Sequence, residues 1–298
     1  MSFLRPAKFF LGLSALLSIT GAVILFVPGP KLSIDFTGGT LMEIALAENV
    51  TKDDVAIAMR SLDMDPPLGT VAVNITRDGT ALLRMRDISN EEHINILSAL
   101  ENMLEGIEER QFTTIGPTVG ASLRQRSLWA LGLAAIAIVL YIAFAFRKVP
   151  RRLSAWRFGI IAVVTLLHDV LVTVGIFVIL SHITSFEFDT LFITALLTII
   201  GYSVNDTIVI FDRIRDNLFL LDTREPFADT AERSLQQSIR RSINTSVSTL
   251  IMLFALFFLG SESIKWFVLT LITGATIGTY SSIFLATPLL VYWRKRNV

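Results

Sequence analysis

Residues 201–217 read GYSVNDTIVIFDRIRDN, and they place a carboxylic acid inside a segment that otherwise suits a lipid bilayer. The apolar stretch begins near residue 190, and Asn205 and Asp206 interrupt it before its charged end is reached. An ionisable side chain costs about 2.5–3.5 kcal/mol at the centre of a bilayer on insertion scales, so it usually faces a partner, a cavity or an ion path. The segment therefore predicts a membrane-spanning helix in which Asp206 has a function.

The composition of the whole chain is that of a membrane protein. Of its 298 residues, 52% are hydrophobic and 17% are charged, whereas soluble domains carry about 25% charged residues. A span needs about 20 apolar residues, and six segments qualify: roughly 9–28, 127–146, 158–181, 190–211, 243–260 and 266–292. The formal net charge of zero gives no support for nucleic-acid binding. The lack of cysteine excludes disulfides, zinc–thiolate sites and cysteine nucleophiles.

Basic residues near the ends of the spans predict the orientation, because lysine and arginine mark the cytoplasmic side. They gather before the first span, between the second and third spans, and at the C-terminus: Arg5, Lys8, Arg147, Lys148, Arg151, Arg152, Arg157, Arg294, Lys295 and Arg296. Both termini are thus predicted to be cytoplasmic. The first span is predicted to be retained, because it is long for a signal peptide and residues 27–30 lack a small-x-small cleavage site. The chain then divides into 1–30 (N-terminus and first span), 31–125 (outer domain) and 126–298 (spans two to six with their loops).

The outer domain, residues 31–125, is predicted to have an α+β fold. The pattern gives these elements in order: a strand at 40–46, a helix after Thr51, strands at 71–75 and 81–85 joined by a turn at Asp78-Gly79, a helix with Ile94, Leu97, Leu100 and Leu104 on one face, and a strand near 109–115. This β-α-β-β-α-β order is that of a ferredoxin-like sandwich. No nucleophile triad, metal cluster or phosphate loop is evident in the segment, so a non-enzymatic binding or transmitting role is expected.

Two further polar groups lie in or near the spans. His168 and Asp169 fall near the middle of the third span, and they are either functional or a structural hydrogen-bonding pair. Arg241 lies at the start of the fifth span, where it either reaches Asp206 or is anchored among lipid headgroups like Arg240. Burial favours the neutral form of a carboxyl group and a neighbouring cation favours the charged form. An aspartate beside an arginine can therefore bind and release a proton, which suggests a proton relay that moves the outer domain.

At these positions the chain resembles the SecF family, the smaller half of the SecD–SecF accessory of bacterial protein export, within the resistance-nodulation-division superfamily. Five motifs occur in the family's order over nearly the whole chain: IDFTGGT at 34–40, GPTVG at 116–120, HDV at 168–170, the segment 201–217, and RSINTS at 241–246. The resemblance implies structural roles for Asp35, Gly38, Gly39, Gly116, Pro117, Gly120 and Gly201.

The resemblance also implies a function and partners. It implies a non-enzymatic subunit of the bacterial inner membrane, with residues 31–125 in the periplasm, which uses protons as coupling ion and no other cofactor. Expected partners are SecD, the SecYEG translocon (SecY, SecE and SecG), YajC, unfolded preprotein and membrane lipid. The proton relay would be Asp206 with Asn205 and Arg241. Arg240 is the alternative to Arg241, and His168 and Asp169 have no settled role.

Two other functions remain open at this stage. The first is an intramembrane aspartyl protease in which Asp169 and Asp206 share a proton and activate water. It is disfavoured because Asp169 lies in mid-helix, whereas Asp206 lies toward the cytoplasmic end. The second is half of a small-molecule exporter, since the superfamily includes drug pumps. It is disfavoured because the outer domain is a single compact unit.

Overall fold

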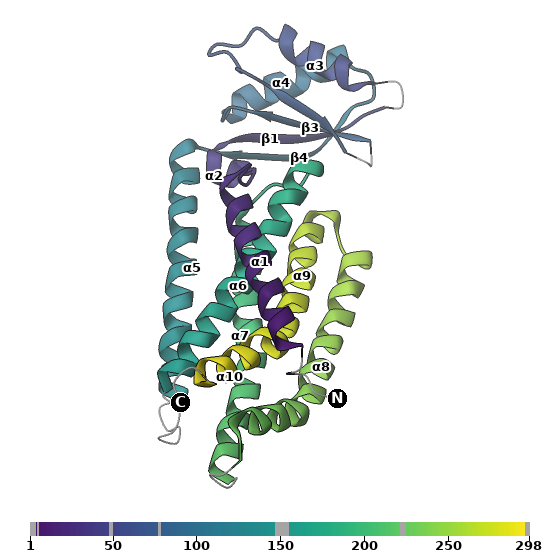
Figure 1. Cartoon of the computed structure of the whole chain (residues 1–298). Helices are drawn as coiled ribbons and strands as arrows, with labels where there is room; N and C mark the ends of the chain where they lie inside the picture. The colour runs from purple at the N-terminus through teal and green to yellow at the C-terminus, as the bar shows by residue number, and fades with distance from the viewer. Residues whose placement is uncertain are drawn as a thin grey trace. The chain divides into compact units, whose positions relative to one another are not determined.

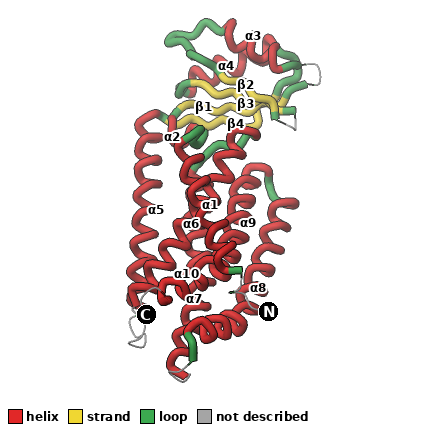
Figure 2. The backbone as a smooth tube through the Cα atoms, in the orientation of Figure 1, coloured by secondary structure: helices red, strands yellow, loops and turns green. Residues whose placement is uncertain are grey.

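The computed structural model describes residues 4, 6–47, 50–76, 79–146, 155–220 and 225–295. These residues form two compact units (Figures 1 and 2). The helical unit consists of residues 1–31, 129–186 and 191–298, and the sheet unit consists of residues 32–128 and 187–190. Several residues used above lie outside the described residues: Arg5, Asp78, Arg147, Lys148, Arg151, Arg152 and Arg296.

The described residues contain six helices that are long and apolar enough to cross a membrane, which confirms the predicted number of spans. The first five are α1 (Ala7–Phe26), α5 (Pro117–Ala145), α6 (Ala155–Ile183), α7 (Thr190–Leu220) and α8 (Phe227–Leu259). The sixth consists of the short η1 (Glu262–Ile264), α9 (Lys265–Ser281), the π-helical η2 (Ser282–Ala286) and α10 (Thr287–Lys295).

Helices α7 and α8 extend beyond the predicted spans, and polar contacts between their ends account for the extension. The amide of Asn217 in α7 donates to Ser234 at 2.8 Å and to Gln237 at 2.9 Å in α8. Arg213 donates to the same Gln237 oxygen at 2.6 Å. These bonds hold two polar helix ends together where hydrophobicity alone gives no signal.

Glycine residues set the closest helix contacts of the helical unit. A Cβ atom added to Gly175 in α6 would lie 2.8 Å from the Cα atom of Gly21 in α1, and one added to Gly278 in α9 would lie 3.0 Å from the Cβ atom of Ser203 in α7. Small residues let helix backbones approach closely in membranes. The approach of α9 to α7 brings the polar end of α9 within reach of α6.

The sheet unit contains four antiparallel strands in the order β2-β3-β1-β4. Its elements are the short α2 (Ile34–Thr37), β1 (Gly39–Ala45), α3 (Lys52–Ser61), β2 (Ala72–Ile75), β3 (Thr80–Met85), α4 (Asn90–Met103) and β4 (Glu108–Ile115). Along β1, buried Met42 and Ile44 alternate with less buried neighbours, as predicted. The predicted cap of α3 is also present, because the Thr51 hydroxyl and the Asp54 carboxylate form a reciprocal capping box.

The predicted apolar face of α4 is wrong at its first residue. Ile94 is 54% exposed, whereas Ile96 and Leu100 are fully buried in the core of the sheet unit. Residues four apart stack on one helix face, so the pair Ile96 and Leu100 defines the buried face. Ile94 lies about 200° around the helix from Ile96, since each residue turns the helix by about 100°.

Candidate functional site

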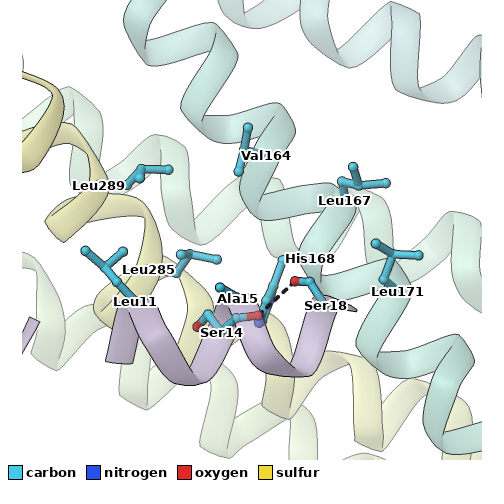
Figure 3. Close-up of a pocket in the computed structure, with 10 residues that line it drawn as sticks. All are labelled: Leu11, Ser14, Ala15, Ser18, Val164, Leu167, His168, Leu171, Leu285 and Leu289. Atoms are coloured by element: carbon cyan, nitrogen blue, oxygen red, sulfur yellow. Dashed lines mark hydrogen bonds between the residues drawn. The ribbon is translucent and has the colours of Figure 1, made fainter. Parts of the chain in front are cut away.

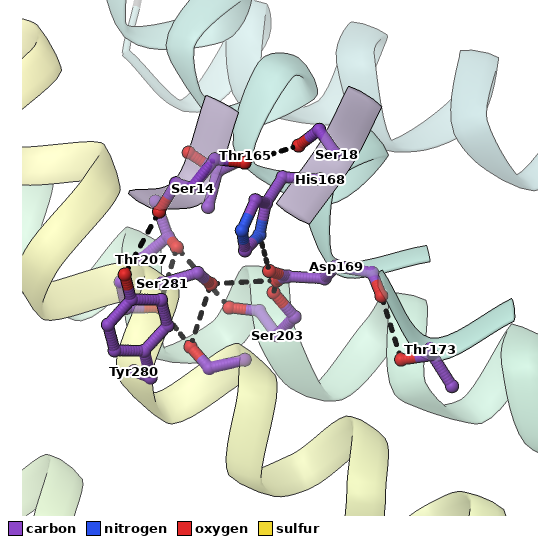
Figure 4. A network of polar contacts seen from close by, with 12 residues as sticks. Ser14, Ser18, Thr165, His168, Asp169, Thr173, Ser203, Thr207, Tyr280 and Ser281 are labelled. Atoms are coloured by element: carbon purple, nitrogen blue, oxygen red, sulfur yellow. Dashed lines mark hydrogen bonds and ion pairs between the residues drawn. The ribbon is translucent and has the colours of Figure 1, made fainter. Parts of the chain in front are cut away.

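The centre of the helical unit holds a buried carboxyl group with three hydrogen-bonding neighbours (Figure 4). Asp169 of α6 is fully buried. Its Oδ1 atom lies 2.9 Å from Nδ1 of His168, and its Oδ2 atom accepts hydrogen bonds from the hydroxyls of Ser203 in α7 and Ser281 in α9, the latter at 2.8 Å. Asp169 therefore links α6 to α7 and α9, and both of its carboxylate oxygens have hydrogen-bonding neighbours.

Further hydroxyl pairs surround this carboxyl group. Thr207 of α7 lies 2.8 Å from Ser282, the first residue of the π-helical segment. The hydroxyl of Tyr280 lies 3.0 Å from that of Ser14 in α1. Together with Asp169 and its partners, these residues form a polar network that joins four of the six spans.

Asp206, the acid that the sequence singled out, is buried but has little hydrogen bonding. It is 4% exposed, and in the described part of the chain its one hydrogen bond comes from the Ser246 hydroxyl of α8 at 3.4 Å. Ser246 itself lies 2.7 Å from the hydroxyl of Thr279 in α9. One turn earlier in α8, the buried Ser242 hydroxyl also lies near this carboxyl group, but among the described residues it forms no bond of ordinary hydrogen-bond geometry. The surroundings of Asp206 are thus polar but loosely connected.

The two candidate arginines lie on the exposed part of α8. Arg241 lines a cavity of about 440 Å³ together with Asp212, Arg213 and Asp216 of α7. Within the described residues no ion pair joins Asp206 to Arg241 or to Arg240. The pairing of Asp206 with one of them stays a prediction.

Asn205 and Gly201 occupy a different face of α7 from Asp206. Both are exposed in the isolated chain, and no atom lies within 4 Å of a Cβ atom added to Gly201. Residues 201 and 205 are four apart, so they share one helix face. Asp206 follows about 100° further around the helix, on the side that packs against α8.

The remaining motif residues cluster in the sheet unit. Gly38 and Gly39 have φ angles of +73° and +121°, which other residues rarely adopt. A Cβ atom added to Gly38 would lie 2.8 Å from the Cα atom of Pro117, and one added to Gly120 would lie 2.8 Å from the backbone nitrogen of Gly38. The start of β1 is therefore pressed against the start of α5, with Gly116 immediately before it in the chain.

Asp35 has a separate role in the same unit. Its carboxylate accepts hydrogen bonds from the backbone nitrogen of Thr190 at 2.9 Å and from the Thr190 hydroxyl at 2.6 Å. Thr190 is the first residue of α7. Asp35 thus accepts a hydrogen bond from the first N–H group of the helix that carries Asp206, a position at which a helix supplies no partner of its own.

Comparison with known proteins agrees with these motifs. The family described as "Protein export membrane protein SecD/SecF, C-terminal" matches residues 95–296, and the "SecD/SecF GG Motif" matches residues 23–50. The chain belongs to the SecD/SecF family. Protein translocase subunit SecF of Thermobaculum terrenum is 42% identical over 96% of this chain and 91% of its own length. The corresponding subunit of Sebaldella termitidis is 36% identical over 91% of this chain and 84% of its own length.

A solved member of the SecD/SecF family has the same fold. The crystal structure of SecDF from Thermus thermophilus, described as a translocon-associated membrane protein, matches with a TM-score of 0.84 and 33% identity. The match covers 99% of this chain and 39% of that longer chain. A structure described as SecDF in a super-membrane-facing form matches with a TM-score of 0.71 and 32% identity.

Sequence reasoning missed several polar residues that this SecD/SecF chain uses. Ser203 and Ser281 hold Asp169, and Thr279 bonds to the serine beside Asp206. The sequence did contain a signal for them, because Ser203, Thr279 and Ser281 are hydroxyl residues within otherwise apolar segments. By contrast, Thr165 and Thr173, which share the face of Asp169, donate to backbone oxygens of their own helix and not to its carboxylate.

Proposed function

We propose that this protein is the SecF-type subunit of a SecD–SecF accessory complex for protein translocation, and that it couples the proton gradient to that process through Asp206. Its family and its relatives, which are named translocase subunits, support the role in translocation. The proton-coupling role is supported by the contrast between two buried carboxyl groups, as follows.

The observation that carries this role is the sparse hydrogen bonding of Asp206. Asp169 has three hydrogen-bonding neighbours on three sides, so a proton added there would disturb a network that joins α6, α7 and α9. Among the described residues, Asp206 has one hydrogen bond of ordinary geometry, a long one from Ser246. Its protonation state can therefore change without breaking the contacts that hold the helices together.

The arginine of the relay is proposed to act from the polar cavity that borders α7 on the C-terminal side of Asp206. Arg241 lines this cavity with two aspartates of α7, so its charge has acidic neighbours there. A conformational change that moves Arg241 toward Asp206 would favour the charged form of the carboxyl group. Arg240 and Asn205 are secondary members of the relay. One charge moved across 100 mV supplies about 2.3 kcal/mol.

The proposal includes a location and partners. The six spans would lie in the bacterial inner membrane with both termini in the cytoplasm. The sheet unit would be a ferredoxin-like domain in the periplasm that moves and engages the emerging preprotein. SecD is the expected partner, because this chain matches only 39% of the length of a longer relative that is named SecDF. Contacts with SecY, SecE, SecG and YajC are part of the proposal, and protons are its coupling ion.

The alternative functions have less support. In the described residues no hydrogen bond joins Asp169 to Asp206, and each has its own partners, whereas a protease dyad needs two carboxyl groups that share a proton. A small-molecule exporter is not favoured by relatives that are named protein translocase subunits.

The proposal is tested in inverted inner-membrane vesicles that contain this protein and its SecD partner. Completion of preprotein translocation after the ATP-driven stage is followed with and without a proton gradient. We expect Asp206→Asn to remove the benefit of the gradient while the complex still assembles. Asp229→Asn is the control, because Asp229 is an exposed carboxyl group in the first turn of α8 and does not line the cavity that contains Arg241. If Asp206→Asn retains the full benefit of the gradient, the proposed coupling role is wrong.

A further inference from the structure

Arg84 of β3 bonds to two chain connections that join the sheet to the long helices. Its guanidinium donates to the carboxylate of Glu187 at 2.7 Å, to the carbonyl oxygen of Leu32 at 2.9 Å and to the hydroxyl of Thr37 at 3.0 Å. Leu32 and Thr37 belong to the connection between α1 and β1, and Glu187 belongs to the connection between α6 and α7. All four residues lie in the sheet unit. One side chain therefore ties both connections to the same strand.

The strand pattern explains why Arg84 faces these connections. Leu83 and Met85 are buried in the core that the sheet forms with α3 and α4. Successive side chains of a strand point to opposite faces of a sheet, so Arg84 emerges from the other face. A guanidinium has five N–H donors in a fixed planar arrangement, whereas a lysine ammonium is a compact point charge. An arginine can therefore hold partners from separate segments at this position.

The two connections are also bonded to each other. The backbone nitrogen of Ser33 donates to the carbonyl oxygen of Phe188 at 2.9 Å. Asp35 accepts two hydrogen bonds from Thr190. Thr190 is the first residue of α7, and the chain passes from the sheet unit into the helical unit directly after it. The first residue of α7 is thus held by the sheet unit, through Asp35 directly and through the bond of Arg84 to the same connection.

The helix that begins at Thr190 is more extensively buried than α1, which leads into the other connection. Buried residues recur along α7 from Phe192 to Asn217, and Asp206 is one of them. In α1, two of the described residues are buried, and a cavity of about 330 Å³ opens between this helix and α6 (Figure 3). Rigid secondary elements carry coupling between distant sites. A shift at the start of α7 therefore reaches Asp206.

We propose that Arg84 is a positioning residue for proton coupling, because it fixes the start of α7 to the sheet. A movement of the sheet unit then shifts Asp206, and a change at Asp206 is passed to the sheet unit through the same bonds. The side chains of Arg84 and Glu187 are 28% and 36% exposed, and exposed ion pairs add little stability. The role of the contact is therefore to fix geometry. This inference rests on the proposed coupling role of Asp206.

Arg86 provides a matched control two residues further along the chain. It donates to the carbonyl oxygens of Pro66 at 2.7 Å and Pro67 at 3.0 Å, and to the carboxylate of Glu92. These partners lie in the loop between α3 and β2 and in α4. Arg86→Gln therefore removes at least as many hydrogen bonds from the sheet unit as Arg84→Gln does, but it leaves both connections intact.

Hydrogen exchange tests the contact itself, independently of any proton coupling. In the full chain in phospholipid nanodiscs, Arg84→Gln should accelerate exchange of the Ser33 and Thr190 amides by about threefold to tenfold, which corresponds to one net hydrogen bond. Arg86→Gln should leave the exchange of these two amides unchanged. Unchanged exchange in Arg84→Gln overturns the proposal.

The coupling role is measured in inverted vesicles that contain the protein and its SecD partner, with and without a proton gradient. Arg84→Gln and Glu187→Ala should each reduce the benefit of the gradient by about twofold to fivefold, the range for one exposed ion pair. Arg86→Gln should retain the benefit. Translocation without the gradient should be the same in all three variants.

The outcomes separate this inference from the proposed function. If Arg86→Gln loses as much of the benefit as Arg84→Gln, the loss reflects the stability of the sheet unit, and the positioning role is wrong. If Arg84→Gln retains the benefit while Asp206→Asn loses it, the positioning role is wrong and the coupling role of Asp206 stands. If Asp206→Asn also retains the benefit, both roles are wrong.

Discussion

The hydrogen bond from Ser281 to Asp169 predicts that these two side chains are energetically coupled. Hydrogen bonds to charged groups contribute about 1.5–3 kcal/mol in proteins generally. Side-chain bonds between membrane helices average about 0.6 kcal/mol, with a maximum of about 1.7 kcal/mol. Asp169 is fully buried, and it keeps His168 and Ser203 as neighbours when the serine is lost. We therefore expect Ser281→Ala to lower the free energy of unfolding by about 1 kcal/mol.

A double-mutant cycle measures this coupling directly. Reversible unfolding in mixed micelles is followed for the wild type, Ser281→Ala, Asp169→Asn and the double variant. The expected interaction energy is about 1 kcal/mol. Ser248→Ala is the control, because the exposed Ser248 hydroxyl donates to the backbone oxygen of Asn244 in its own helix. Independent sites add within about 0.3–0.5 kcal/mol, so an interaction energy of that size or smaller refutes the reasoning.

The remaining predictions concern helix packing and acid stability. Gly21→Leu should destabilise the helical unit by about 1–3 kcal/mol through overpacking against α6, as measured by thermal unfolding in detergent, whereas Gly12→Leu should not, since nothing lies within 4 Å of a Cβ atom there. The Arg86 guanidinium at 2.5 Å lowers the pKa of Glu92 from 4.5 to about 2. A carboxyl group whose pKa is lowered by folding stabilises the fold at every pH above its pKa in the unfolded chain. This stabilisation is lost as the pH falls from about 4.5 to 2. The unfolding temperature of Glu92→Gln should therefore fall less steeply than that of the wild type over this range, and parallel curves would contradict this prediction.

The spans and most elements of the sheet unit follow from local patterns. The alternation around Met42 and Ile44 predicts β1, and Thr51 predicts the start of α3, because these signals depend on neighbouring residues alone. The face of α4 could not be assigned correctly from apolar spacing. Both Ile94 and Ile96 are apolar, and only the packing against the sheet decides which of them is buried.

The partners of the buried acids could not be derived from the sequence. Asp169 meets residues 34 and 112 positions away, and Asp206 meets one 40 positions away. Such contacts depend on how far the helices approach, which the glycines at 21, 175 and 278 control. The sequence identifies acids that need partners inside a membrane, but the packing of the helices determines which hydroxyls reach them.

The π-helical segment η2 rotates the second half of the sixth span about the helix axis relative to the first half. A π turn accommodates one residue more than an α turn, so α10 is rotated relative to a straight continuation of α9. Before the segment, α9 directs Gly278 and Ser281 toward α7 and α6, and after it, α10 buries Leu290. Removing one residue from 282–286 would restore α-helical spacing and turn the end of the span by about 100°. The contacts made by both of its ends therefore fix the length of this span in residues.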